Sequence, residues 1–316
     1  MSQKPVIAVT GATGAQGGGL VRAILNDPER RFAARAVTRN AGSDRAKALT
    51  AAGAEVVVAD LDDPTGLEKA FAGAHGVFGV TNFWEHVSPE KELAQAGNLA
   101  AAAKKAGVKH VIWSTLEDTR KRVPLDDPRM PTLMGKYKVP HLDAKGEADA
   151  LFTAAGAPTT FLLTSFYWDN LISFGMGPRP GPDGKLAFAL PMADKKLPGM
   201  AVEDIGRCAY GVFREGTVNV GKRIGIAGEH LTGAQMADAL GRALGRDVVY
   251  QAVPHDVYRS LGFPGADDLG NMFQFKCDFE TEYCAARDLK RSRELNPALM
   301  TFDAWLKEHK DRITLE

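Results

Sequence analysis

The sequence predicts an α/β fold, in which a doubly wound parallel sheet is followed by a smaller mixed α/β domain. Short apolar runs alternate with helical stretches over residues 1–163, and a glycine-rich turn joins the first run to the first helix. The alternation is lost beyond residue 163. We therefore expect residues 164–316 to form the smaller domain, with some of its segments returning to the main sheet.

Six apolar runs of strand length precede the expected boundary. They lie at residues 6–9, 32–38, 55–59, 76–80, 108–113 and 160–163. Helical spacing and Pro and Gly end signals predict helices at residues 20–25, 43–52, 64–71, 88–106 and 141–155. Because helices alternate with the strands, we expect parallel strands joined by right-handed crossovers.

Two stretches interrupt the regular pattern. Residues 117–140 are rich in charge and proline, and loops of this length are usually functional lids or insertions. Residues 174–184 are rich in glycine and proline and are expected to form a loop. The remaining predicted elements are helices at 202–213, 232–244, 257–261 and 300–309 and a strand at 248–253.

Composition argues against several classes of protein. Lys and Arg together number 39, as do Asp and Glu, so no overall field draws the chain to nucleic acid or an anionic membrane. No apolar stretch approaches the roughly 18 residues of a membrane helix, and the first strand begins too early for a signal peptide. The three cysteines lack metal-ligand spacing. We expect a cytoplasmic protein with free thiols and no metal.

The turn after the first strand carries Gly11, Gly14 and Gly17. The first glycine permits a sharp turn, the second permits close approach of a phosphate, and the third lets the helix pack on the strand. The helix that follows offers free N–H groups and its positive dipole end to a pyrophosphate. The context favours a dinucleotide site, and a glycine-rich turn without a ligand is the alternative.

The end of the second strand indicates which nucleotide binds. NAD-binding proteins usually place an acidic residue there to accept a hydrogen bond from the ribose 2′-hydroxyl. This chain has Arg39, followed by Asn40 and Ser43. Because arginine pairs bidentately with phosphate, NADP(H) is the predicted cofactor. A solvated surface arginine is the alternative.

Residues after the third and fourth strands are expected at the same edge of the sheet, along which such folds bind the nucleotide. These residues are Asp60, Leu61, Thr81, Asn82, Phe83 and Trp84. Asp60 and Leu61 would contact the adenine, and the other four would lie beside the pyrophosphate and the nicotinamide ribose. The two aromatic side chains could instead cap the sheet.

A reductase on this fold needs a proton donor near the transferred hydride. The usual solution is a Ser after the fifth strand and a Tyr four residues before a Lys on the next helix. Here Ser114 and Lys145 are present, but His141 stands four residues before Lys145, and Tyr137 lies one turn earlier. His141 could act as an acid, because the pKa of imidazole lies near neutrality, or could be an ordinary helix-start residue. We expect Lys145 to hold the nicotinamide ribose.

These motifs together resemble the NmrA-like family, an atypical branch of the short-chain dehydrogenases/reductases. The resemblance is carried by residues 10–18, 37–40, 80–85, 145–147 and 167–170. Residues 261–266, 269–273 and 299–310 are similar to the vertebrate NADPH-sensing branch of that family.

The resemblance implies a Rossmann domain, a preference for NADPH and frequent loss of the catalytic tyrosine. It would place the 2′-phosphate on Arg39 and the pyrophosphate on the glycine-rich turn, at Gly11, Thr13, Gly14, Ala15 and Gln16. It would surround the nicotinamide and its ribose with residues 82–85, Lys145, Tyr167, Trp168, Asp169 and Asn170.

Our leading hypothesis from the sequence is an NADP(H)-binding sensor or regulator with weak or no dehydrogenase activity, acting on a protein partner. The alternative is an NADPH-dependent reductase of a small carbonyl, enone or quinone. A homodimer is compatible with either hypothesis. Direct DNA binding finds little support, because the basic run at residues 120–122 is flanked by acids and no recognition helix is visible.

Overall fold

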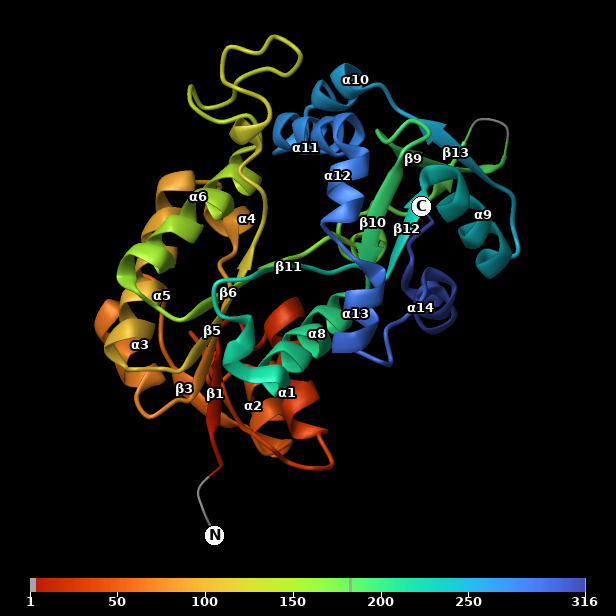
Figure 1. Cartoon of the computed structure of the whole chain (residues 1–316). Helices are drawn as coiled ribbons and strands as arrows, with labels where there is room; N and C mark the ends of the chain where they lie inside the picture. The colour runs from red at the N-terminus through yellow and green to blue at the C-terminus, as the bar shows by residue number, and fades with distance from the viewer. Residues whose placement is uncertain (1–3, 182–183, 316) are drawn as a thin grey trace.

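A computed structural model describes residues 4–181 and 184–315, and it contains a seven-stranded sheet between two helical layers (Figure 1). Neighbouring strands of this sheet are all parallel, in the order β11-β6-β5-β4-β1-β2-β3. The strands are β1 (Val6–Val9), β2 (Ala33–Thr38), β3 (Glu55–Val58), β4 (Gly76–Gly79), β5 (His110–Thr115), β6 (Thr159–Leu163) and β11 (Arg223–Gly225). The predicted doubly wound sheet is confirmed.

Helices cover both faces of the sheet, and each face has its own apolar core. One face is covered by α1 (Ala15–Leu25), α2 (Asp44–Ala51) and α8 (Val202–Glu215). The other is covered by α3 (Pro64–Phe71), α5 (Pro89–Lys105) and α6 (Pro140–Ala155). The strand order reverses between β1 and β4, which is where doubly wound sheets bind their ligands.

Helix α8 and strand β11 follow residue 163 in sequence but belong to the main sheet in space. Helix α8 packs against α1 at a glycine contact, because a Cβ on Gly206 would overlap the backbone of Gly19 and Leu20. Strand β11 pairs with β6, from Arg223 beside Phe161 to Gly225 beside Leu163. The second half of the chain therefore completes the nucleotide-binding half.

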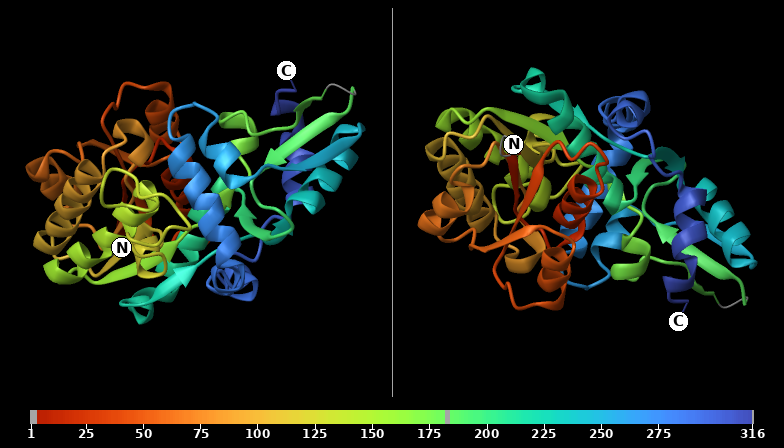
Figure 2. Two further views of the ribbon diagram at one scale, coloured as in Figure 1. Left: turned by 90° about the horizontal axis from the view of Figure 1, so that it is seen from above. Right: turned by 90° about the horizontal axis from the view of Figure 1, so that it is seen from below.

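The rest of the second half forms a lobe beside the sheet (Figure 2). It contains two three-stranded sheets around a third apolar core. The strands are β7 (Phe166–Tyr167), β8 (Arg179–Pro180), β9 (Leu186–Leu190), β10 (Lys196–Met200), β12 (Glu229–Thr232) and β13 (Val248–Ala252). The helices are α7 (Asn170–Ser173), α9 (Gly233–Leu244), α10 (His255–Arg259), α11 (Ala266–Asp278), α12 (Glu280–Ala285), α13 (Leu289–Leu295) and α14 (Phe302–His309).

Two sequence-based expectations need correction in this lobe. The loop expected at residues 174–184 contains the short strand β8, while residues 182 and 183 lie outside the described part of the chain. Strands β9 and β10 and helices α11 to α13 were not predicted from periodicity. Among the described residues, no helix has the length and apolar character needed to cross a membrane.

The charged stretch at residues 117–140 is held near both of its ends by hydrogen bonds to Asp143. The buried carboxylate of Asp143 accepts hydrogen bonds from the backbone N–H groups of Thr119 and Lys138, at 2.7 and 2.8 Å. The Lys138 ammonium donates to two carbonyls of the same stretch, and Asn271 on α11 donates to the Lys138 carbonyl at 2.6 Å. The stretch thus links α6 to α11.

Candidate cofactor and substrate site

A cavity of about 1590 Å³ runs from the carboxyl edge of the sheet into the second lobe. Its walls combine the glycine-rich turn with residues of β9, α10, α11 and α12. Most of the predicted site residues line it, namely Gly11, Thr13, Gly14, Ala15, Gln16, Gly17, Arg39, Asn40, Ser43, Asp60, Leu61, Thr81, Asn82, Phe83, Trp84, His141, Lys145, Tyr167 and Asn170. A cofactor groove and a second chamber therefore form one continuous space.

The glycine-rich turn leaves the start of α1 open to this cavity. Gly11 has a φ of +59°, a left-handed conformation, and a Cβ on Gly17 would lie 2.5 Å from the Gly11 carbonyl oxygen. Gly14 caps the helix without a side-chain hydrogen bond. The first N–H groups of α1 thus have no side-chain acceptor at the cap, which suits an anionic ligand.

Arg39 lies on the exposed rim of the groove and pairs with Glu85 from α4 (Phe83–His86). This hydrogen bond raises the pKa of Arg39 above its already high ordinary value. The side chains of Asn40 and Ser43 shape the turn instead, because Asn40 accepts from the Gly42 N–H and Ser43 caps α2. Arg39 and Arg45 are cations in this part of the cavity lining.

Lys145 lines the cavity but is held by protein groups. Its Nζ donates to Glu92 Oε1 at 2.6 Å and to Thr81 Oγ1 at 2.7 Å. Glu92 is completely buried on α5, so Lys145 provides its charge partner. Lys145, which the sequence analysis expects to hold the nicotinamide ribose, is ion-paired here with Glu92, a buried partner that the sequence analysis did not identify.

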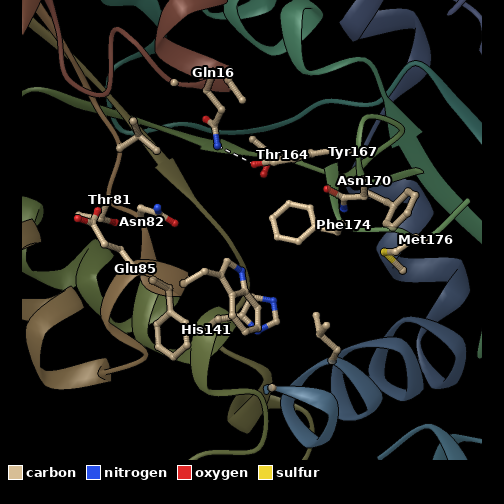
Figure 3. A pocket seen from close by; sticks show the side chains of 18 of the residues that line it. Gln16, Thr81, Asn82, Glu85, His141, Thr164, Tyr167, Asn170, Phe174 and Met176 are labelled. Atoms are coloured by element: carbon tan, nitrogen blue, oxygen red, sulfur yellow. Dashed lines mark hydrogen bonds between the residues drawn. The ribbon is translucent and has the colours of Figure 1, made fainter. Parts of the chain in front are cut away.

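Ser114 connects to the cavity through Gln16 rather than directly. Ser114 Oγ donates to Gln16 Oε1 at 2.8 Å. Gln16 Nε2 in turn donates to Tyr167 Oη at 2.6 Å (Figure 3). Burial raises the pKa of Tyr167, so its phenol stays protonated at neutral pH. The chain of bonds fixes the orientation of the Tyr167 phenol at the cavity wall.

His141 is paired with Asp268, a residue of α11. The distance from His141 Nδ1 to Asp268 Oδ1 is 2.7 Å, and the His141 backbone N–H donates to the other carboxylate oxygen at 3.2 Å. The imidazole packs on the Trp84 ring, with centroids 4.9 Å apart, and faces the cavity (Figure 3). Because Nδ1 is engaged, Nε2 is the nitrogen available to a ligand.

Trp168, Asp169 and Tyr137 lie outside the cavity lining. Tyr167 of β7 lines the cavity, whereas Trp168, in the turn after β7, packs in the core of the second lobe. The Asp169 carboxylate accepts from the Val202 N–H at 3.0 Å, at the start of α8. Tyr137 is buried beside Arg120, with the guanidinium carbon 5.1 Å from its ring centroid. These three side chains serve the fold.

A model described as the NmrA-like family matches residues 3–306. The chain belongs to the NmrA-like family. One NmrA-like relative, the oxidoreductase FrzB of a Cladobotryum species, is 28% identical over 294 residues, covering 85% of this chain and 83% of FrzB.

Two solved structures share the NmrA-like fold. NmrA, a negative transcriptional regulator, has a TM-score of 0.79 at 24% identity over 97% of this chain and 95% of NmrA. It is also described in complexes with NAD and with NADP. The Citrobacter triphenylmethane reductase complexed with NADP(H) has a TM-score of 0.75 at 22% identity over 96% of this chain and 99% of that chain.

Proposed function

We propose that this NmrA-like chain binds NADP(H) and reduces a small carbonyl, enone or quinone in the chamber beyond the cofactor groove. The observation that carries the proposal is the continuity of the cavity, whose wall includes the glycine-rich turn, Arg39 and the His141–Asp268 pair. Pockets that join apolar walls to a few placed polar groups are typical of small-molecule sites.

The residues present fit a dinucleotide phosphate. The uncapped start of α1 suits a pyrophosphate, and a Cβ at Gly14 would lie 3.2 Å from the Gly11 carbonyl oxygen. Arg39 would hold the 2′-phosphate in place of Glu85. NmrA and the Citrobacter reductase, both described with NADP, support this choice of cofactor.

NADPH supplies a hydride when it is bound, and the chain must then supply a proton. His141 would donate that proton from Nε2 to the oxygen that becomes a hydroxyl. Asp268 would hold the ring through Nδ1–H and so direct Nε2 toward the substrate. His141 replaces the tyrosine that is usual at this helix position, while Lys145, paired with Glu92, would provide positive charge near the ribose.

A regulator that binds NADP(H) without turnover is the second candidate. Lys145 is held by Glu92, and His141 on α6 is bonded to α11 of the second lobe. Occupancy of the cavity could therefore bias how the two lobes are arranged.

The test is NADPH oxidation, followed by its absorbance, over a panel of aldehydes, enones and quinones. The reductase proposal expects turnover by the wild type and a loss of about 10²–10⁴-fold in His141→Gln, with unchanged NADPH affinity. Tyr137→Phe is the matched control, because Tyr137 lies outside the cavity lining, and it should retain activity. Tight NADPH binding without turnover would favour the regulator.

A further inference from the structure

Lys276 on α11 is a buried cation in the wall of the chamber. It is 4% exposed and lines the cavity. Its Nζ lies 3.2 Å from Met272 Sδ and over the rings of Phe273 and Tyr283, 5.6 and 5.5 Å from their centroids. Among the described residues, no carboxylate or carbonyl oxygen accepts a hydrogen bond from this ammonium group. A thioether and two aromatic faces are weak partners for a charge.

The charged groups around Lys276 do not neutralise it. The buried Arg287 and the partly buried Glu117 form a bidentate pair, with distances of 2.6 and 2.9 Å, and their charges cancel. Burial raises the pKa of the adjacent Cys277 thiol to about 12, so the thiol is neutral. Asp268, on the same helix, is bonded to His141. Among the described residues, Lys276 is therefore the cation of this cluster that has no carboxylate bonded to it.

Buried charges in proteins are normally paired, because an isolated charge away from water is costly. Burial accordingly lowers the pKa of Lys276 to about 7, with the positive charge of Arg287 acting in the same direction. An anionic group in the chamber would supply the missing partner. It would also raise the pKa of Lys276 and keep the lysine charged.

We propose that Lys276 binds a carboxylate oxygen of the substrate, so that the chamber selects an apolar carbonyl compound that also carries a carboxylate over its neutral analogues. The surrounding lining is apolar or aromatic, with Leu269, Met272, Phe273 and Tyr283 among its members, which suits a hydrocarbon or aromatic body. A single ammonium matches a monoanion better than a phosphate dianion. The inference rests on the proposed function, because it assigns a substrate class to the same chamber.

The test compares cinnamate with cinnamamide by isothermal titration calorimetry, in the presence of saturating NADP⁺, so that no hydride is available. At pH 6 we expect the wild type to bind cinnamate about ten- to a hundredfold more tightly than cinnamamide. At pH 9 the preference for cinnamate over cinnamamide should shrink, because a smaller fraction of Lys276 is protonated. Equal binding of the two compounds at pH 6 would overturn the proposal without any variant.

Lys276→Met keeps the length and apolar body of the side chain, and it should abolish the preference for the acid. Lys310→Met is the matched control, because Lys310 is a partly buried lysine that donates to the Ala243 carbonyl away from the cavity. A preference that survives Lys276→Met in a protein with an unchanged melting temperature would contradict the assignment. NADPH turnover of neutral carbonyls without any acid preference would refute the Lys276 site alone. A Lys276-dependent preference without turnover of any carbonyl would refute the reductase alone.

Discussion

At the scale of the residue, we propose that Arg39 decides between the two nicotinamide nucleotides. Arg39 is held by Glu85, so a 2′-phosphate must compete with a carboxylate for the same guanidinium. Exposed ion pairs of this kind are worth only about 0–1 kcal/mol, whereas a charge-assisted pair with phosphate is stronger. The competition should therefore favour the phosphate.

We predict that the wild type binds NADPH more tightly than NADH and that Arg39→Ala loses about ten- to a hundredfold in NADPH affinity. NADH affinity should change little in the variant. Glu85→Gln is a matched control that frees Arg39, and it should leave NADPH affinity unchanged or higher. Fluorescence titration measures all three proteins, and equal affinities of the wild type for both cofactors would refute the role of Arg39.

At the scale of the element, close helix contacts depend on glycine. Gly206 of α8 allows backbone contact with α1, the helix whose N-terminus opens to the cavity. Gly97 of α5 is also inside a helix, but a Cβ there would lie 3.8 Å from a Leu151 methyl carbon, an ordinary contact. The two positions therefore respond differently to the same substitution.

Gly206→Ala should lower the free energy of unfolding by about 1–3 kcal/mol, because the added methyl group forces α1 and α8 apart. Gly97→Ala should raise it by about 0.5–1 kcal/mol, because alanine is the better helix former. Urea unfolding measures both changes. A neutral Gly206→Ala would show that α1 and α8 are not in close contact.

Strand β5 carries a buried histidine that makes the protein sensitive to acid. His110 bonds to Thr160 at 2.8 Å, and burial lowers its pKa to about 4 from the ordinary value of 6.5. Between these values the unfolded chain binds more protons, so stability falls as the pH drops from 6.5 to 4. The expected loss is about 3 kcal/mol.

Urea unfolding at pH 7 and at pH 4.5 would measure this loss. His110→Gln keeps a polar group near Thr160 without the titration, so it should lose less stability than the wild type over this range. Identical pH dependence of the two proteins would contradict the assignment.

Sequence patterns predict the main sheet well because its strands are apolar and end at glycine-rich or polar turns. In the second lobe they predict α9, β13 and α14 but miss β9, β10 and α11 to α13, for identifiable reasons. Strand β10 contains Pro198 and Gly199, which are poor strand formers, and α11 buries the polar residues Asp268, Asn271 and Lys276. Polar residues on a buried face obscure the helical period.

The part of the candidate site that lies at the ends of the main-sheet strands was predictable from the sequence. The glycine-rich turn and Arg39 follow strands of the main sheet, so their position in the sequence indicates their place in the fold. Asp268 is 127 residues from His141, and no local pattern relates the two. Glu92 stands on an amphipathic helix, where a carboxylate is ordinarily expected to face solvent.

At the scale of the whole molecule, the proposed function depends on the contact between the two lobes. The cofactor groove is built from the sheet, the chamber is lined by residues of β8, β9 and α10 to α12, and the His141–Asp268 pair links α6 to α11. Strand β11 and helix α8 fasten the second half of the chain to the first. This arrangement gives one continuous cavity, which we propose holds both a nucleotide and a second ligand.

The central claim is that the nicotinamide ring lies at this junction, between Tyr167 and His141. A crystal structure of the complex with NADP⁺ tests it most directly. We predict the pyrophosphate at the N-terminus of α1, Arg39 turned from Glu85 to the 2′-phosphate, and the nicotinamide within reach of His141. A nicotinamide directed away from the chamber, with Arg39 still paired to Glu85, would contradict the account.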